Sequence, residues 1–217
     1  MPPSSPAGCV PGWKICARAT GAAASTKTGA RSQRCIGAES TTRAPLAVHR
    51  NLHEVIAFGG VDLLDDALRV IASLNEAGVD YVVVGGVALN LHGLVRATED
   101  LDVFVRPDPA NVERLRDALK RVWDDPSIDE ITAEDLCGDY PAVRYGPPEG
   151  ELYLDILTRL GEATQFTDLE VEEKDVEGLV VRVATPRSLY RMKRGTVRAI
   201  DRADADALRA AFDVGDG

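Results

Sequence analysis

The sequence predicts an α+β fold, in which helices pack on a mixed β-sheet. The first observation is that short β-branched segments alternate with amphipathic segments in the order strand–helix–strand–helix, followed by further strands and two helices. The second is that 45% of the residues are hydrophobic at a mean hydropathy of −0.11. Both are typical of a globular domain, and because no apolar run reaches the length of a membrane span, we expect no membrane association.

Each element follows from a local pattern. Between residues 61 and 78 the apolar side chains recur at helical spacing up to Gly78, a favoured helix-ending residue. The run Tyr81–Val84 is β-branched and stops at two glycines, as a strand followed by a turn does. Helices are expected at 61–78, 87–92, 109–123, 187–200 and 201–212, and strands at 81–84, 101–105, 128–132, 141–145, 151–157 and 179–183.

The first fifty residues differ from the rest in composition and charge. They hold seven Lys or Arg and one acid, whereas residues 51–217 carry a net charge of −16. A segment without a hydrophobic period does not bury enough apolar area to offset its ordering entropy. We therefore expect residues 1–55 to be a disordered or misassigned extension and residues 60–213 to form the domain. The four cysteines lack metal-ligand spacing, which favours reduced thiols and a cytoplasmic protein.

Two aspartates begin the strand expected at 101–105. Asp100 and Asp102 are two residues apart, so on a strand they share a face, about 6.7 Å apart along the backbone. Two carboxylates about 4 Å apart repel by roughly 4 kcal/mol at an effective dielectric constant near 20, unless a cation lies between them. Hard oxygen ligands suit Mg²⁺ or Mn²⁺. When this motif is considered alone, the alternative interpretation is a pair of aspartates exposed to solvent.

A glycine pair and a third aspartate strengthen the interpretation of this motif as a metal site. Gly85 and Gly86 follow an apolar strand and open a short helix, where backbone N–H groups can approach a phosphate closely. Asp155 interrupts the apolar strand 151–157, a costly position unless the charge is paired or metal-bound. Three carboxylates on neighbouring strands would provide a two-metal site for in-line phosphoryl displacement.

This combination resembles the nucleotidyltransferase superfamily of DNA polymerase beta. The string Gly85-Gly86-Val87-Ala88, His92-Gly93, Arg96, Thr98, Asp100, Asp102 is similar to small prokaryotic members, including toxins of toxin–antitoxin and abortive-infection systems. The resemblance spans residues 62–212.

The resemblance implies a role for several residues. The glycine turn and Val87 would hold the triphosphate, although many members have Ser where this chain has Val87. Asp100, Asp102 and Asp155 would bind the metal, Mg²⁺ or Mn²⁺. A late lysine followed by acids is matched by Lys193, Asp201 and Asp204.

Helical geometry adds detail to the C-terminal part. If residues 187–200 form one helix, Lys193 lies at the edge of the inward face, where it would reach a phosphate, while a snorkelling surface lysine is the alternative. Arg96 and Thr98 are expected to flank the phosphate path. The opposite face of that helix would carry a stripe of arginines, which contacts RNA or an acidic partner or is simply exposed to solvent. These arginines are Arg187, Arg191, Arg194 and Arg198. His92 is expected to be a packed or capping residue, and Cys137 a core or loop thiol.

The predicted function is transfer of a nucleotidyl group from a nucleoside triphosphate to an acceptor, which is a protein, a tRNA or a small molecule. An antitoxin protein is a further expected partner. The main alternative is a catalytically inactive nucleotidyltransferase-like binding module. A sugar-nucleotide glycosyltransferase also uses Asp-x-Asp, but the glycine turn upstream and Asp155 favour nucleotidyl transfer. A haloacid-dehalogenase-like phosphatase is disfavoured, because Asp100 follows Ala97-Thr98-Glu99 rather than an apolar strand.

Overall fold

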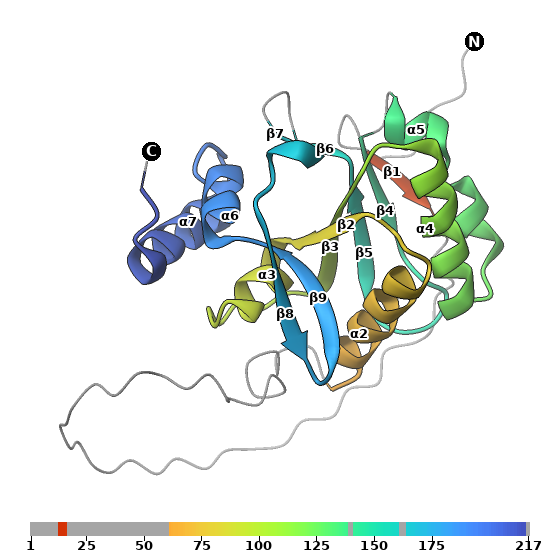
Figure 1. Cartoon of the computed structure of the whole chain (residues 1–217), viewed down its shortest axis with the longest axis horizontal. Coiled ribbons are helices and arrows are strands. Elements are labelled where there is room, and N and C mark those ends of the chain that lie inside the picture. Colours follow the sequence, from red (N-terminus) through yellow and green to blue (C-terminus); the bar gives the residue numbers. More distant parts are fainter. Residues whose placement is uncertain (1–12, 17–60, 139–140, 161–163, 216–217) are drawn as a thin grey trace, which may run out of the picture.

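The computed structural model describes residues 13–16, 61–138, 141–160 and 164–215. Seven strands form one mixed sheet in the order β1-β4-β5-β3-β2-β9-β8 (Figure 1). The strands of this sheet are β1 (Trp13–Cys16), β2 (Tyr81–Val84), β3 (Asp100–Val105), β4 (Ala142–Tyr145), β5 (Tyr153–Leu157), β8 (Val171–Val176) and β9 (Leu179–Ala184). A separate pair consists of β6 (Arg159–Leu160) and β7 (Thr164–Gln165).

Parallel and antiparallel pairs alternate within the sheet, which confirms the predicted mixed topology. β3 is antiparallel to β2 and parallel to β5, while β4 is antiparallel to β5. On the other side, β2 is parallel to β9, and β9 is antiparallel to β8. β3 and β5 are therefore neighbours in the middle of the sheet, and both are buried along most of their length.

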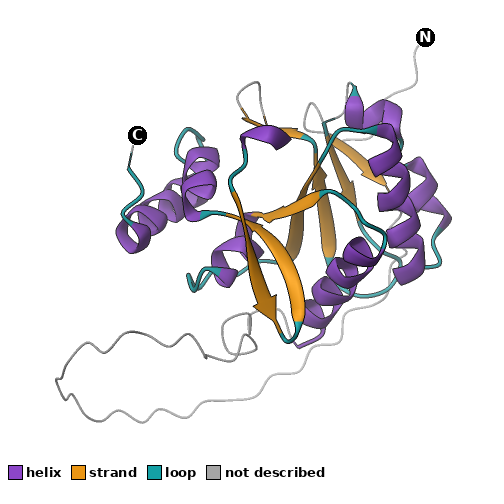
Figure 2. Cartoon of the chain, viewed as in Figure 1, coloured by secondary structure: helices purple, strands orange, loops and turns teal. Residues whose placement is uncertain are grey.

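Helices surround the sheet (Figure 2). They are α2 (Val61–Glu76), α3 (Gly85–Leu91), α4 (Pro109–Val122), α5 (Ala133–Cys137), α6 (Pro186–Lys193) and α7 (Ala199–Phe212), with short 3₁₀ turns η1 (Pro126–Glu130) and η2 (Phe166–Asp168). α2 packs on α4, where the Ser73 hydroxyl donates to the Ala118 carbonyl at 2.8 Å. α6 packs on α7 at the opposite end of the molecule from α4 and α5 (Figure 1). No helix of the described residues is long and apolar enough to cross a membrane.

Three expectations about elements differ from the structure. Residues 128–132 are not a strand: Asp125 and Thr132 accept from backbone N–H groups and start η1 and α5 there. The expected helix 187–200 ends at Lys193, and α7 begins at Ala199. The expected stripe of four arginines is therefore broken: Arg187 and Arg191 lie in α6, whereas Arg194 and Arg198 flank the gap between α6 and α7.

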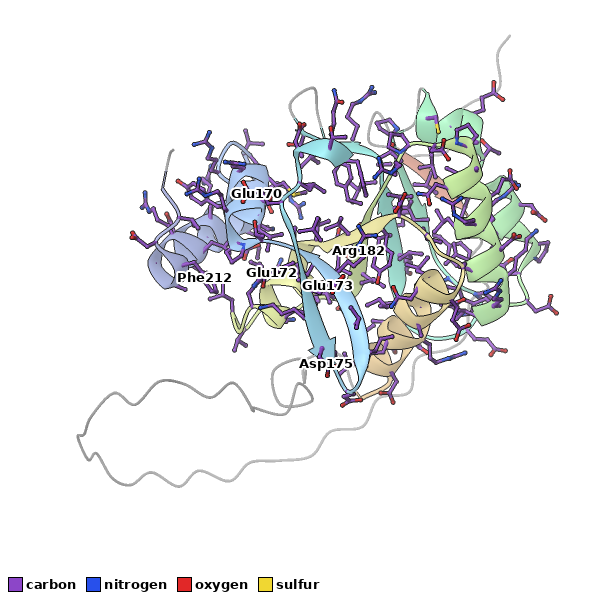
Figure 3. The ribbon with its side chains drawn as sticks, in the orientation of Figure 1. Glu170, Glu172, Glu173, Asp175, Arg182 and Phe212 are labelled. Atoms are coloured by element: carbon purple, nitrogen blue, oxygen red, sulfur yellow. The ribbon has the colours of Figure 1, made fainter. Side chains whose placement is uncertain are left out.

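Strands β1 and β8 were not expected. β1 lies inside the segment predicted to lack order and pairs in parallel with β4; the remaining residues of 1–55 lie outside the described residues. β8 lacks the apolar pattern that predicts a strand, because it is an edge strand with Glu172, Glu173 and Asp175 along it (Figure 3). Charged side chains on an edge strand discourage further strand pairing.

Candidate active site

The sheet brings the three predicted aspartates together. Asp100 and Asp102 project from β3, and in the parallel register Asp102 lies directly beside Asp155 of β5. Cα partners in neighbouring strands carry side chains on the same face of a sheet. The carboxylates therefore form one group, called here the carboxylate cluster: Asp100, Asp102 and Asp155.

A fourth member of this site, Arg144, was not predicted. It lies on β4 directly opposite Asp155. Its Nε donates to Asp155 Oδ1 at 2.7 Å and its Nη2 donates to Asp155 Oδ2 at 3.0 Å. The same Nη2 lies 2.9 Å from Asp100 Oδ2. The available signal was an arginine inside the otherwise apolar strand Ala-Val-Arg-Tyr, which is as unusual as the aspartate inside β5.

The cluster is electrostatically strained. Burial raises the pKa of Asp102 to about 7, and the neighbouring charges of Asp155 and Asp100 contribute to the rise. Burial also raises the pKa of Asp155, although the hydrogen bond from Arg144 opposes this. The pKa of Arg144 is raised, first by its hydrogen bond to Asp155 and then by the charges of all three aspartates. Three carboxylates and one guanidinium leave a net negative charge that favours binding of a further cation.

The glycine turn packs directly against this cluster. Gly85 has φ +67°, and a Cβ at this position would lie 1.8 Å from Asp102 Oδ2. The Gly86 N–H donates to Asp102, and a Cβ on Gly86 would lie 2.7 Å from Thr98 Cβ. Only a residue without a side chain fits either position, because the carboxylate and Thr98 approach the backbone so closely. Val87 is buried in the core, so this residue can offer a ligand only its backbone.

The loop between α3 and β3 carries Arg96 and Thr98. The side chain of Asn90, which is 2% exposed, holds this loop: its Nδ2 donates to the Arg96 carbonyl at 2.9 Å, and its Oδ1 accepts from the Arg96 N–H at 2.8 Å. The Thr98 hydroxyl donates to the Asp100 carbonyl at 3.1 Å. The loop is thus fixed at both ends beside the glycine turn.

A second charged group, called here the lysine network, joins α6, α7 and this loop: Lys193, Asp201, Asp204 and Arg96. Lys193 Nζ donates to Asp201 at 3.0 Å and to Asp204 at 2.8 Å, and Arg96 Nε lies 3.3 Å from Asp204. Burial alone would raise the pKa of Asp201, but the hydrogen bond and charge of Lys193 outweigh it, and the pKa is lowered. Lys193 is inward, as predicted, and its charge also acts to lower the pKa of Asp102.

Of two residues without a predicted chemical role, His92 is placed as expected and Cys137 is not. His92 ends α3, and its Nε2 lies 2.8 Å from the Ala184 carbonyl in a contact that packs α3 against β9. Its ring meets the ring of Phe212 edge-on. Phe212 is the last residue of α7 (Figure 3). Cys137, expected in the core or in a loop, instead ends helix α5 as an exposed thiol.

The residues present fit a divalent cation by the chemistry of their donors. Three hard carboxylates lie on neighbouring strands, and the charges of Asp155 and Asp100 add to the burial that raises the pKa of Asp102. Within the described residues, however, no three His, Cys, Asp or Glu side chains are already arranged to hold a metal ion. Arg144 contacts two of the three carboxylates instead.

The mixed sheet places an Asp-x-Asp pair beside a third strand aspartate, with a glycine turn packed against them, which is the arrangement that the resemblance to nucleotidyltransferases implies. The comparison with protein families agrees. Residues 66–204 match the family model described as "Nucleotidyl transferase AbiEii toxin, Type IV TA system". This chain belongs to that family and is a nucleotidyltransferase, which confirms the resemblance, the fold class and the class of enzyme predicted from the sequence.

Solved structures with a similar shape carry related names. An antigenic nucleotidyltransferase-like protein from Paracoccidioides brasiliensis matches at 17% identity and TM-score 0.45, covering 70% of this chain and 77% of that one. ANT(2″)-Ia in complex with adenylyl-2″-tobramycin matches at 12% identity and TM-score 0.43, covering 69% and 90%. No curated protein matches the chain. The family assignment therefore rests on the family model.

Proposed function

We propose that this nucleotidyltransferase uses Mg²⁺ or Mn²⁺ to transfer a nucleotidyl group from a nucleoside triphosphate, and that it acts in the cytoplasm as the toxin of a toxin–antitoxin pair. The observation that carries the proposal is the convergence of Asp100, Asp102 and Asp155 in register on β3 and β5. In the reaction, an oxygen of the acceptor bonds to the α-phosphorus as the bond to pyrophosphate breaks.

Each group of residues has a separate task in this proposal. Asp100, Asp102 and Asp155 would hold the metal, which neutralises charge on the triphosphate and on the departing pyrophosphate. Gly85 and Gly86 let the main chain lie against Asp102 and Thr98. The backbone N–H groups of this turn and of Val87 would bind the polyphosphate.

The lysine network would supply the cationic wall of the nucleotide site. Lys193 and Arg96 are held by the buried carboxylates of Asp201 and Asp204, so they are fixed before the ligand arrives. Fixed cations cost less ordering entropy on binding than free side chains. Thr98 packs against Gly86 and sets the width of the turn.

The partners follow from the same assignment. The family of type IV toxins implies a nucleoside triphosphate donor and an antitoxin protein as partners. The acceptor is a protein, a tRNA or a small molecule such as an aminoglycoside. The alternative, a binding module without catalysis, is favoured by one observation, the engagement of Asp100 and Asp155 by Arg144.

The decisive experiment is incubation of the full chain and of Asp102→Asn with each α-labelled nucleoside triphosphate, Mg²⁺ or Mn²⁺, and cell extract. The wild type should label one class of acceptor, and Asp102→Asn should lower labelling by at least about a hundredfold, because even residues that only support metal ligands are worth 10–100-fold. No labelling by the wild type with any triphosphate, or equal labelling by the variant, would favour the binding module.

A matched pair of glycine variants tests the nucleotide site separately. Gly85 and Gly178 both have positive φ, +67° and +85°, so alanine strains the backbone similarly at each. Only the new Cβ of Gly85→Ala meets Asp102; that of Gly178→Ala has nothing within 4 Å. Calorimetric titration with a triphosphate and Mg²⁺ should show binding lost in Gly85→Ala and kept in Gly178→Ala. Equal affinities would place the nucleotide elsewhere.

A further inference from the structure

Arg144 is a cation in contact with two carboxylates that the proposed function assigns to a metal. Its guanidinium engages both oxygens of Asp155, at 2.7 and 3.0 Å, and reaches Asp100 at 2.9 Å. A fork of this kind, with two N–H groups on one carboxylate, is among the strongest polar contacts in proteins. Each of these oxygens directs one lone pair at Arg144, so a metal ion that binds them has to compete with the guanidinium for the same carboxylates.

The two partners of this contact differ in their freedom to move. The Asp155 side chain is 7% exposed, whereas the Arg144 side chain is 37% exposed. Arg144 comes from β4, and its guanidinium lies 5.3 Å from the centre of the Tyr153 ring, which is also exposed. The carboxylate is fixed in the sheet, and the arginine can rotate toward solvent without disturbing the core.

We propose that Arg144 is the resident counter-ion of the carboxylate cluster, which a divalent cation displaces from Asp100 and Asp155 when it binds. The inference rests on the proposed function, because it takes the cluster to be a metal site. Arg144 holds the carboxylates near one another in the metal-free protein by reducing their repulsion. It also competes with the metal for the same oxygens, so metal affinity is lower than the three carboxylates alone would give.

Competition between Arg144 and the metal predicts a different sign for the change in metal affinity than a purely structural role of Arg144 does. If Arg144 only kept the aspartates in place, removing it would weaken metal binding. If it competes, removing it leaves the carboxylates unpaired, and the metal then relieves their full repulsion. Arg144→Gln should therefore make the metal-free protein less stable and the metal complex tighter.

The test measures binding of Mn²⁺ itself by the loss of the free-ion signal in electron paramagnetic resonance, without any turnover. Arg144→Gln should bind Mn²⁺ about tenfold more tightly than the wild type, within the usual range of coupling between two ligands of one site. Arg144→Lys, which keeps the charge but loses the fork, should lie between them. The melting temperature of Arg144→Gln should be lower without metal and should rise more on adding Mn²⁺.

Arg106→Gln is the matched control. Arg106 follows the other end of β3 and contacts Asp80 at 3.0 Å, so its loss removes an ion pair without touching the cluster, and Mn²⁺ affinity should not change. Unchanged or weaker Mn²⁺ binding by Arg144→Gln overturns the inference and leaves the proposed function standing. If Arg144→Gln does not fold, the same reading applies to Arg144→Lys. If neither the wild type nor the variants bind Mn²⁺, with or without a nucleoside triphosphate, the metal site itself is wrong and both proposals fail.

Discussion

The carboxylate cluster and the lysine network lie close together and are built from the same kinds of side chain, yet their charges are balanced differently. In the lysine network two aspartates meet Lys193 and Arg96, the exposed Arg198 lies a further 3.7 Å from Asp201, and the pKa of Asp201 is lowered. In the cluster three aspartates meet one cation, Arg144, and the pKa of Asp102 is raised to about 7.

The difference indicates that buried charged groups have two roles in this protein, one in stability and one in the proposed binding of a cation. A balanced group stabilises the fold and fixes its own members in position. An unbalanced group lowers the stability of the protein alone and gains when a cation binds. Removal of the cation Lys193 from the lysine network and of the carboxylate charge of Asp102 from the cluster should therefore change the stability of the metal-free protein with opposite signs, and this is the sharpest way to test the comparison.

The largest effect is expected from Lys193→Met. It leaves Asp201 and Asp204 buried without their shared cation, and the free energy of unfolding should fall by about 3 kcal/mol, as for other broken buried ion pairs. Urea denaturation measures this. Lys120→Met is the control, because Lys120 pairs with Asp129 on the surface, where solvent screens the ion pair and its loss changes stability little.

Nucleotidyl transfer should be lost in Lys193→Met and kept in Lys120→Met. If the two variants are equally stable, the lysine network does not hold α6 to α7. If Lys193→Met is destabilised but fully active, Lys193 has a structural role alone.

Much of this organisation was predictable from local sequence. The strands β2, β3 and β5 and the placement of Asp100, Asp102 and Asp155 follow from apolar runs and from the two-residue period of a strand. The glycine turn was predictable because both glycines stand between a β-branched run and a helix. The charge break near residue 50 predicted the start of the domain, which stays a prediction.

The features that could not be predicted from the sequence depend on contacts between segments that are distant in the chain. An arginine inside the apolar strand β4 is unusual in the sequence, but its contact with the carboxylates follows only from the register of β4 and β5, which sets it opposite Asp155. The role of Asn90 needs the fold of the loop that it clamps, and its sequence neighbours give no sign of it. β8 has no apolar alternation, because it is an edge strand whose pairing with β9 supplies its stability.

For Asp102→Asn we expect a rise in the free energy of unfolding, opposite in sign to the fall expected for Lys193→Met and smaller in size. The folded protein holds a proton on Asp102 up to a pKa of about 7, and the unfolded chain releases it near pH 4. The contribution of Asp102 to stability therefore falls as pH rises from about 4 to about 7, and then stays constant. The asparagine side chain of the variant does not titrate, so metal-free Asp102→Asn should exceed the wild type in stability by about 1–2 kcal/mol at pH 8.

The same variant should lose this advantage as pH falls toward 5, where Asp102 is already protonated in the wild type. Urea denaturation of both proteins at pH 5 and pH 8 in a chelator measures the difference. Mn²⁺ should reverse the order at pH 8, since it stabilises the wild type through Asp102. A difference that is constant with pH would mean that Asp102 is not strained by its neighbours.

The smallest effect concerns the loop that connects the two regions. Asn90→Ala removes both hydrogen bonds to Arg96, so Arg96 loses its fixed position beside Asp204 while the carboxylate cluster keeps every contact. The nucleoside triphosphate should bind about fivefold more weakly, equivalent to about 1 kcal/mol for a lost hydrogen-bonded clamp, and Mn²⁺ binding should not change. Asn75→Ala is the control, because Asn75 also makes two hydrogen bonds, to Val180 and Tyr81. Isothermal titration with the triphosphate measures both. Equal weakening in the two variants would reflect a general loss of stability, whereas weakening in Asn90→Ala alone would show that the lysine network reaches the nucleotide through Arg96.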